Sequence, residues 1–578
     1  MKKLIYTLFF VLISVVANGQ AKYVFYFIGD GMGVNQVNGT EMFQAELQNG
    51  RIGVEPLLFT QFPVATMATT FSATNSVTDS AAAGTALATG KKTYNHAISV
   101  NEEKNAIQTV AEKAKKAGKK VGVTTSVSVD HATPAAFYAH QPDRNMYYEI
   151  ALDLPKANFD FYAGGGFLKP TTTFDNKKAP SIFPIFEEAG YTVARGYNDY
   201  KAKSQNAEKM ILIQEEGANP SCLPYAIDRK DNDLTLAQIT ESAIDFLTKG
   251  KNKGFFLMVE GGKIDWACHA NDAATVFNEV KDMDNAIKVA YEFYKKHPKE
   301  TLIVVTADHE TGGIVLGTGK YALNLKALQH QKHSADGLSK RISELRKSKG
   351  NKVTWEDMKT FLGEEMGFWK QFPISWEQEK KLRDEFEKSF VKNKVVFAES
   401  MYSKSEPMAA RAKEVMDEIA MVGWVSGGHS AGYVPVFAIG AGYQFFGENV
   451  AMKRNFSSKR NAIYNTILST TTHPSARWIY EQLKPDYPDL SLGTVYRNIS
   501  LFKNEGKVSV VCNVNGEERI DGNTSPHTHF VCICCGRVID VADDGSKSSE
   551  SLALLNKGFT IESKLVIYYG KCSDCCNN

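Results

Sequence analysis

The chain has 578 residues, a length that excludes a protein with a single hydrophobic core and predicts at least two domains. Its hydrophobic content of 43% and charged content of 23% are ordinary for globular proteins. The net charge of +2 comes entirely from residues 452–578, which hold 15 Lys+Arg against 13 Asp+Glu. The rest of the chain holds 52 of each and is neutral.

The first 20 residues have the pattern of a signal peptide. Two lysines precede the apolar run Leu4–Val16, and Ala17 and Gly19 are small residues at the expected cleavage site. A retained membrane anchor is the alternative, but the run is short for a span of roughly 20 residues. We therefore expect a periplasmic or secreted protein that has no membrane attachment after cleavage.

Short apolar runs in the first half alternate with helical patterns, and each run ends in polar side chains. The runs are Tyr23–Ile28, Lys120–Thr124, Phe255–Val259 and Leu302–Val305, and the helical patterns include Ala106–Ala117 and Thr235–Leu247. This alternation predicts an α/β fold with a mostly parallel sheet covered on both faces. Ligands bind beyond the C-terminal strand ends of such sheets. The polar side chains expected to converge there are Asp30, His131, Thr133, Glu260, Asp265, Asp308 and His309.

Ser80 is a candidate nucleophile. It stands before the small-residue segment Ala81–Thr89 and is expected at a helix N-terminus, where free N–H groups and the helix dipole favour an anion. An Asp-Ser pair taken alone is an ordinary helix cap. The metal-ligand types around it in the predicted fold favour the functional interpretation.

Three histidines and their acidic neighbours have the spacing of metal ligands. Asp265 and His269 are four residues apart and so share one helix face, as two ligands of a single metal require. His309 follows Asp308 directly, and His429 lies in a glycine-rich stretch before the predicted strand Val434–Ile439. One such histidine is usually structural, whereas this combination indicates a metal site.

The motifs of the first half resemble those of alkaline phosphatases over about residues 21–450. They occur in the order of that family and are Gly29-Asp-Gly-Met-Gly33, Thr78-Asp-Ser-Ala-Ala-Ala-Gly-Thr-Ala86, His131-Ala-Thr-Pro-Ala135, Glu260 to His269, Thr306-Ala-Asp-His309 and the segment of His429. The resemblance implies a three-layer sandwich and the hydrolysis of phosphate monoesters. Related phosphodiesterases are the alternative. They usually carry Thr as nucleophile and lack the third metal, so Ser80, Glu260 and Arg144 favour a monoesterase.

The resemblance also implies two zinc ions and one magnesium ion. The residues that match the family's ligands are Asp265, His269 and His429 for the first zinc, Asp30, Asp308 and His309 for the second, and Asp30, Thr133 and Glu260 for magnesium. Ser80 matches the nucleophile between the zinc ions, and Arg144 matches the arginine that binds phosphate.

Two positions differ from the family pattern. His131 stands where some members have Asp, and Trp266 where some have Lys. Imidazole suits Zn or Co better than Mg, so the metal preference of the third site is open. Residues 320–420 are rich in Lys and Glu and predict an inserted helical subdomain, whose charges we interpret as a solvated face.

The second half predicts a winged helix-turn-helix over residues 452–522. Three helices, Lys459–Leu468, Ser475–Leu483 and Leu492–Lys503, precede a strand pair at Ser509–Asn513 and Glu518–Asp521. The third helix, with Ser491 as its cap, is expected to lie in the major groove of DNA. Its candidate base or phosphate contacts are Thr494, Tyr496, Arg497 and Asn498.

The cysteines of the chain are concentrated in the second half. The first 451 residues contain only Cys222 and Cys268, which excludes a disulfide framework there, whereas the last 127 contain seven cysteines. Two C-x-x-C pairs have the spacing of a structural zinc site within a small α+β dimerisation domain at residues 523–578. The four zinc ligands are Cys532, Cys535, Cys572 and Cys575, and the nearby candidates for a second metal are His473, Asp521, His527, His529 and Asp540. A metal that joined both domains would couple its occupancy to DNA binding.

The second half resembles the ferric uptake regulator (Fur) superfamily over about residues 455–576. Asp521 and the pair His527-Thr-His529 resemble its peroxide-sensing PerR branch. The resemblance implies Fe or Mn as the regulatory metal, release of DNA when His473 or His527 is oxidised, and a homodimer, which either half could form.

The two halves are expected in different compartments. Export separates a repressor from its DNA, and the C-terminal half belongs in the cytoplasm. Met452 precedes Lys453-Arg454-Asn455 as the start of a free-standing repressor would, and no Gly/Ser or Pro linker joins the halves. We interpret the chain as two adjacent reading frames that have been joined. The alternatives are a bifunctional sensor-phosphatase and a transcription factor whose enzyme half is incidental.

Overall fold

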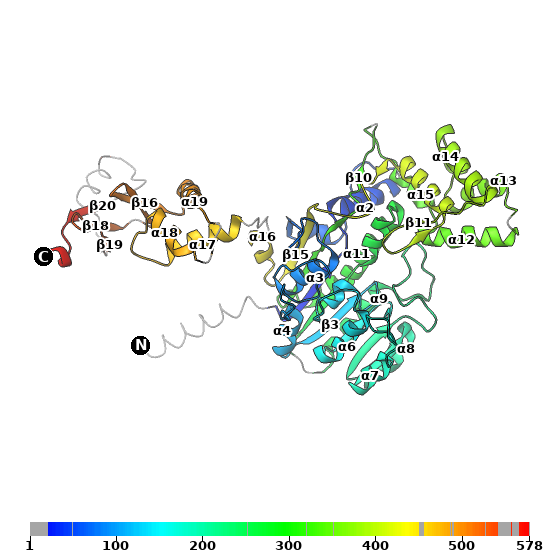
Figure 1. Ribbon diagram of the computed structural model, residues 1–578, viewed down its shortest axis with the longest axis horizontal. Coiled ribbons are helices and arrows are strands. Elements are labelled where there is room, and N and C mark those ends of the chain that lie inside the picture. The colour runs from blue at the N-terminus through cyan, green and yellow to red at the C-terminus, as the bar shows by residue number, and fades with distance from the viewer. Residues whose placement is uncertain are drawn as a thin grey trace. The chain divides into compact units, whose positions relative to one another are not determined.

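The structure is a computed structural model (Figure 1). It describes residues 21–48, 50–250, 253–319, 321–350, 352–449, 456–485, 487, 490–525, 527–541, 557 and 566–576. The signal peptide predicted at residues 1–20 lies outside these residues. Within them, none of the helices is long and apolar enough to cross a membrane. The chain divides into two compact units, Met1–Met452 and Lys453–Asn578, and each is described by itself.

A nine-stranded sheet forms the centre of the first unit. Its strand order is β2-β15-β8-β1-β7-β3-β4-β6-β5. Among the described strands of this sheet, β15 alone runs opposite to the others, so the predicted mostly parallel sheet is confirmed. The strands are β1 (Tyr23–Ile28), β2 (Val64–Ala68), β3 (Lys120–Thr125), β4 (Phe161–Ala163), β5 (Tyr191–Arg195), β6 (Lys209–Ile213), β7 (Phe255–Glu260), β8 (Thr301–Thr306) and β15 (Val434–Gly440).

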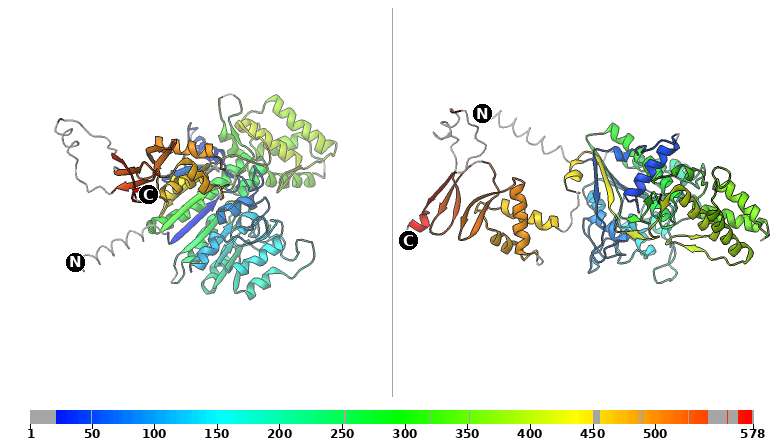
Figure 2. Two further views of the ribbon diagram at one scale, coloured as in Figure 1. Left: turned by 60° about the vertical axis from the view of Figure 1, so that its left-hand side comes forward. Right: turned by 90° about the horizontal axis from the view of Figure 1, so that it is seen from above.

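Helices cover both faces of this sheet, which gives three layers (Figure 2). Strand β7 is buried along its whole length: Phe255 and Leu257 join the core on one face, and Phe256 and Met258 join the core on the other. A continuous apolar run is therefore what this position in the sheet requires. The helices are α2 (Val34–Leu47), α3 (Ser80–Thr89), α4 (Val110–Lys116), α5 (Ala132–Ala135), α6 (Tyr147–Ala157), α7 (Ile182–Glu188), α8 (Gly196–Lys203), α9 (Leu236–Thr248), α10 (Lys263–His269), α11 (Ala273–Lys296) and α16 (Gln444–Asn449).

Helix α4 begins four residues later than the sequence pattern predicts. Thr109 and Glu112 form a capping box, in which each side chain accepts a hydrogen bond from the other residue's backbone N–H. Upstream, the backbone N–H of Ile107 donates to the carbonyl of Ser99 and is taken out of the helix. The capping box therefore sets the helix start, and the apolar residues before it belong to a loop.

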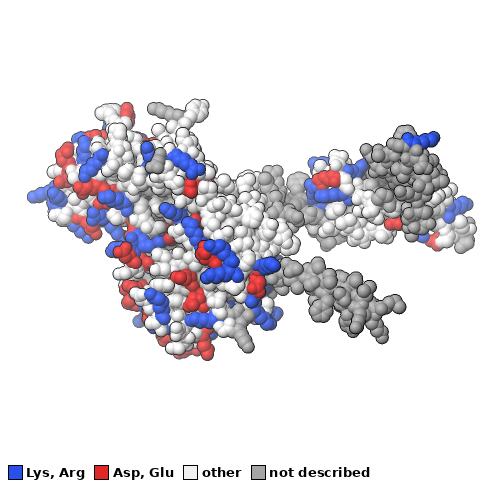
Figure 3. All heavy atoms as spheres, turned by 180° about the vertical axis from the view of Figure 1, so that it is seen from behind, with Lys and Arg blue, Asp and Glu red and all other residues white. Residues whose placement is uncertain are grey.

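The inserted segment is helical, as predicted, but its inner face belongs to the main core. Its elements are η4 (Leu325–His330), α12 (Ala335–Ser348), α13 (Trp355–Glu365), α14 (Trp376–Phe386), the π-helical turn η5 (Glu387–Val391), the hairpin β11 (Ala398–Glu399) and β12 (Lys404–Ser405), and α15 (Pro407–Ala420). Leu338, Met358 and Val415 pack in the same cluster as the sheet. The solvated face that the charge run predicted is therefore only the outer side of this segment. Basic and acidic side chains are interspersed over the surface of the first unit that Figure 3 shows.

The described residues of the second unit form three longer helices, a hairpin, a separate three-stranded sheet and one short helix. The helices α17 (Phe456–Leu468), α18 (Ala476–Leu483) and α19 (Leu492–Asn504) enclose one core with the hairpin of β16 (Ser509–Val514) and β17 (Glu517–Asp521). Ser491 caps α19 as predicted, by accepting a hydrogen bond from the N–H of Thr494 at 3.2 Å. The further sheet has the order β19-β18-β20, and its elements are β18 (Thr528–Cys532), β19 (Val538–Val541), β20 (Val566–Gly570) and the short helix α21 (Ser573–Cys576).

Candidate active site and metal clusters

Ser80 is the first residue of helix α3 and is fully buried. Asp79 caps the helix, since its Oδ1 accepts a hydrogen bond from the N–H of Ala82 at 3.0 Å. A Cβ added at Gly84 would lie 3.1 Å from the Cβ of Ala136, so the small residues of α3 let it approach α5 closely. The hydroxyl of Ser80 thus lies at the positive end of a helix dipole, at the C-terminal edge of the sheet.

One cluster of metal-ligand types follows strands β1 and β8. It contains Asp30, Asp308 and His309, whose ligand atoms all lie within 4.8 Å of one another. Nε2 of His309 lies 3.2 Å from Oγ of Ser80 and 3.4 Å from a carboxylate oxygen of each aspartate. Burial, together with the neighbouring carboxylates, raises the pKa of Asp30 and Asp308 well above the ordinary range. Such packing of like charges is typical of a site that binds a cation.

A second cluster joins helix α10 to His429, the first residue of the short strand β14 (His429–Ser430). Nε2 of His269 lies 3.2 Å from Oδ2 of Asp265, and Nε2 of His429 lies 3.8 Å from Oδ1 of the same aspartate. The other ring nitrogen of each histidine faces a backbone carbonyl, Gly427 O at 2.6 Å and Thr78 O at 2.9 Å. These carbonyls fix the ring orientation, so both Nε2 atoms point into the cluster. The sequence identified the histidines but not the carbonyls.

A third cluster lies at the ends of β1, β3 and β7 and contains Asp30, His131 and Glu260. Burial raises the pKa of Glu260 to about 7, and burial together with Arg144 lowers that of His131 to about 3. The hydroxyl of Thr125 donates to Glu260. Thr133, on α5, is fully buried beside this cluster.

The three clusters fit metal ions by the chemistry of their buried atoms. Among the described residues, both carboxylate oxygens of Asp30, both ring nitrogens of His131 and one oxygen each of Glu260, Asp265 and Asp308 are buried without a hydrogen-bond partner. Leaving such groups unpaired costs about 1–3 kcal/mol each, and more if they are charged. A bound cation would satisfy them, so the donor sets suit the metals that the sequence predicted.

Arg144 is buried and is held at both ends of its guanidinium group. Nη1 donates to Oδ2 of Asp79 at 3.1 Å, and Nη2 donates to Oη of Tyr402 at 3.2 Å. Tyr402 comes from the turn between β11 and β12, and its ring stacks on Trp266 with a centroid distance of 4.6 Å. Tyr402 is not among the predicted site residues, because no spacing or motif distinguishes it from other residues of the insertion.

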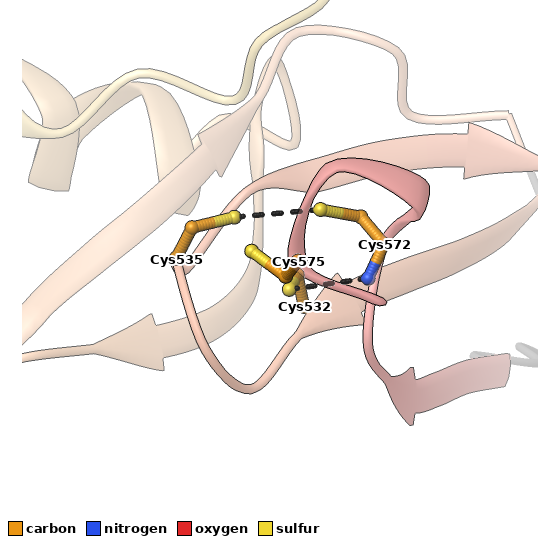
Figure 4. Close-up of side chains that lie close together, drawn as sticks. All are labelled: Cys532, Cys535, Cys572 and Cys575. Carbon is orange, nitrogen blue, oxygen red and sulfur yellow. Dashed lines mark hydrogen bonds between the residues drawn. The ribbon is translucent and has the colours of Figure 1, made fainter. Parts of the chain in front are cut away.

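Four cysteines of the second unit converge (Figure 4). The sulfur atoms of Cys532, Cys535, Cys572 and Cys575 lie within 4.8 Å of one another, and Sγ of Cys535 is 3.7 Å from Sγ of Cys572. Backbone N–H groups, first that of Cys535 and then that of Cys572, lower the pKa of Cys532 to about 5. A thiolate is the form that binds zinc, so the set fits a tetrahedral structural site.

The other predicted metal ligands of the second unit also lie together. His473, Asp521, His527 and His529 place ligand atoms within 4.8 Å of one another. Oδ1 of Asp540, on β19, lies 3.0 Å from Nε2 of His473. His473 precedes α18, so this cluster connects the helical part of the unit to its three-stranded sheet.

The predicted DNA-contacting residues on α19 do not all face the same way. Tyr496 and Arg497 are exposed and Thr494 is half-buried. Asn498 is buried, and its amide donates to the carbonyl of Thr494 at 2.7 Å. Asn498 therefore lies on the packed side of the helix, a direction that the sequence prediction did not anticipate.

Comparisons with known proteins match each unit to a different family. Residues 21–160 and 189–454 match the family model described as alkaline phosphatase, and residues 452–569 match the one described as the ferric uptake regulator family. Alkaline phosphatase 4 of Bacillus subtilis is 33% identical over 434 residues, which cover 73% of this chain and 84% of that protein.

Solved structures resemble the first unit. A crystal structure of a cold-active alkaline phosphatase from Shewanella sp. has a TM-score of 0.61 and 29% identity, and the match covers 73% of this chain and 95% of that one. An alkaline phosphatase from the Antarctic bacterium TAB5 has variants in which Asp or Glu replaces a histidine, described with Mg bound in the M3 site. These two variant structures have a TM-score of 0.51 and 28% identity, and the match covers 74% of this chain and 93% of each.

Proposed function

This chain belongs to the alkaline phosphatase family, and we propose that its first unit hydrolyses phosphate monoesters through a phosphoseryl intermediate on Ser80. The observation that carries the proposal is the position of the Ser80 hydroxyl, 3.2 Å from His309 of one cation-binding cluster. The His309 ring stacks on that of His429, a member of the second cluster, with a centroid distance of 3.6 Å. A serine between two such clusters suits an in-line displacement at phosphorus.

The residues of the site have different roles in the proposed reaction. Asp265, His269 and His429 would hold one zinc ion, and Asp30, Asp308 and His309 the other. When bound, the paired cations supply positive charge that ionises the serine and stabilises the attacking and leaving oxygens.

Groups of the protein bind the phosphate, attack phosphorus and stabilise the charge at Ser80. Arg144 offers N–H groups from both ends of its guanidinium to two oxygens of the phosphate. Ser80 attacks phosphorus with its Oγ, the alcohol leaves, and water then cleaves the phosphoserine. The N-terminus of α3 stabilises negative charge at Ser80 throughout.

A trapping experiment tests the nucleophile. Rapid acid quenching of the full chain with a radiolabelled monoester should leave label on Ser80, and Ser80→Ala should abolish both the label and turnover. Ser348→Ala, at the end of α12 on the surface, is the matched control. Normal turnover by the Ser80→Ala chain would exclude the proposed mechanism.

We propose that Asp30, Thr133 and Glu260 form the third metal site, which matches the magnesium site of the family, and that His131 shifts its preference from magnesium toward zinc or cobalt. The support is the imidazole of His131 in the cluster, since Mg prefers oxygen ligands. The TAB5 variants with Asp or Glu for a histidine and Mg in the M3 site point the same way. The His131→Asp chain should retain more Mg after dialysis against mixed metals, as measured by elemental analysis; an unchanged metal content would refute the assignment.

For the second unit we propose a metal-dependent repressor of the PerR type. Three helices and a hairpin would form a winged helix with α19 in the major groove. Cys532, Cys535, Cys572 and Cys575 would hold structural zinc, and the cluster around His473 and Asp521 would hold regulatory Fe or Mn. The supporting observation is that His473 and Asp540 approach to 3.0 Å across the two parts of the unit. A DNA footprint that survived chelation and His527→Ala would rule out metal-gated binding.

We propose further that export directs the first unit to the periplasm or beyond, and that the two units work as separate proteins from joined reading frames. Two observations support this: export would separate the DNA-binding unit from DNA, and the chain divides into two compact units directly after Met452. Intact mass spectrometry of native cells decides between the alternatives. A species near 64 kDa would favour a bifunctional sensor-phosphatase, and two shorter products would favour joined frames.

A further inference from the structure

We propose that Tyr402 is a positioning residue of the phosphate site, which fixes Arg144 in the orientation that receives a phosphate group. The proposal deepens the phosphatase function above and rests on it. It concerns a residue of the inserted segment rather than a residue at a strand end.

The two hydrogen bonds to Arg144 fix the plane of its guanidinium group. Asp79 accepts from Nη1 and Tyr402 accepts from Nη2, at 3.1 and 3.2 Å. Each terminal nitrogen carries two N–H groups. One N–H on each nitrogen is therefore engaged, and the second one on each remains for a phosphate oxygen. An arginine that is already held in this way loses less conformational freedom when phosphate binds.

The ring of Tyr402 is itself anchored among residues of the site. It stacks on Trp266 with an interplanar angle of 14°, and it meets the rings of His131 and His269 nearly edge-on, with centroid distances of 5.7 and 5.3 Å. These contacts hold the phenol without using its oxygen. Oη therefore remains free to accept the hydrogen bond from Nη2 of Arg144.

The hairpin that carries Tyr402 is attached to the rest of the insertion. The backbone N–H of Ser400 donates to the carbonyl of Ser403 at 2.9 Å and closes the turn. The N–H of Glu406, just past β12, donates to Oγ of Ser339 on α12 at 2.9 Å. The position of Tyr402 therefore depends on the packing of the insertion, whereas the positions of the candidate metal ligands depend on the sheet.

Tyr402→Phe removes the oxygen and keeps the ring. Because the phenol acts on bound phosphate through Arg144 and not on the reacting atoms, we expect KM and the inhibition constant of inorganic phosphate to rise about three- to tenfold. We expect kcat to change by less than about twofold. A purely structural role would lower the thermal stability or kcat and leave phosphate inhibition unchanged.

The test uses the full chain with p-nitrophenyl phosphate as substrate and inorganic phosphate as inhibitor. Tyr197→Phe is the matched control, because Tyr197 lies on helix α8, outside the site, and its Oη donates to Glu241 of α9 at 2.9 Å. The control should match the wild type in KM, kcat and phosphate inhibition. If Tyr402→Phe also matches the wild type in KM and phosphate inhibition, or loses kcat alone, the proposal is overturned.

Calorimetric titration of inorganic phosphate separates this proposal from the proposed function. If the wild-type chain hydrolyses no monoester, the proposed function fails, but weaker phosphate binding by Tyr402→Phe would still support the role of Tyr402. Tyr402→Ala extends the series by removing the ring. It should bind phosphate more weakly than Tyr402→Phe, and equal affinity of wild type, Phe and Ala chains would overturn the proposal even if the Ala chain is less stable.

Discussion

Oδ2 of Asp79 lies 3.1 Å from Nη1 of Arg144, so the residue that caps the nucleophile helix also holds the phosphate-binding arginine. The other oxygen of the same carboxylate accepts the hydrogen bond from the N–H of Ala82. One side chain therefore links the start of α3, where Ser80 lies, to the group that would orient the substrate. The two roles use different oxygens and can be separated by substitution.

We predict that Asp79→Asn and Asp79→Ala differ in stability. Asn can still cap the helix, whereas Ala loses the cap and should lower the free energy of unfolding by about 1 kcal/mol. Both should weaken phosphate inhibition, because both remove the charge that holds Arg144. Thermal unfolding and inhibition by inorganic phosphate measure the two effects. Equal stability of the two variants would contradict the capping role.

The sheet and the clusters at its edge could be predicted because their signals are local in the sequence. Strand β7 reads as an apolar run that ends at Glu260, and α10 brings Asp265 and His269 to one face by their four-residue spacing. Tyr402 could not be predicted in this way. It reaches Arg144, 258 positions earlier in the chain, only through the packing of the insertion, and nothing in its neighbouring sequence records that contact.

Helix α19 shows the same limit of sequence-based prediction for the direction of a single side chain. Its boundaries follow from Ser491 as a cap and from the apolar period, both of which are visible in the sequence. The direction of a polar side chain on it is decided by tertiary packing. Asn498 turns inward because its amide can donate to the carbonyl of Thr494, one turn earlier, within a buried environment.

We predict that the cysteines of the second unit differ in their effect on zinc content. Cys532→Ser should remove about one zinc ion per chain and lower the thermal stability of the second unit, because a structural zinc site needs all four thiolates. Cys534→Ser is the matched control, since Cys534 is exposed and lies outside the cluster. Elemental analysis and thermal unfolding measure both. Loss of zinc from both variants would argue against the assigned ligand set.

We predict a pH dependence of stability that comes from Asp417, on α15. Burial raises the pKa of its carboxyl to about 8 from 3.8, and its Oδ2 accepts a hydrogen bond from Nε1 of Trp424 at 2.9 Å. Between these two values the folded chain binds the proton and the unfolded chain does not. Stability should therefore fall as the pH rises through this window, by up to about 1.4 kcal/mol per pH unit.

Asp417→Asn removes this dependence, because the amide oxygen still accepts from Trp424 and carries no proton to lose. Its free energy of unfolding should vary less between pH 5 and 8 than that of the wild type, with metals saturating in both. Asp384→Asn, on the exposed side of α14, is the control and should keep the wild-type slope. Identical slopes for wild type and Asp417→Asn would show that Asp417 does not take up a proton on folding.

On helix α19, we predict that Arg497 and Asn498 have separable roles, although they are adjacent. Arg497 is exposed, so Arg497→Ala should leave the thermal stability unchanged. If it contacts a base, DNA binding should weaken by about 1–3 kcal/mol; if it contacts a phosphate, the salt dependence should fall by about one unit of slope.

Asn498→Ala should instead lower stability by about 1 kcal/mol, since it removes a buried hydrogen bond. Fluorescence anisotropy with operator DNA at several salt concentrations, well below the unfolding temperature, separates the two. Loss of affinity in the Asn498→Ala chain at full folding would mean that α19 turns this side chain outward when DNA binds.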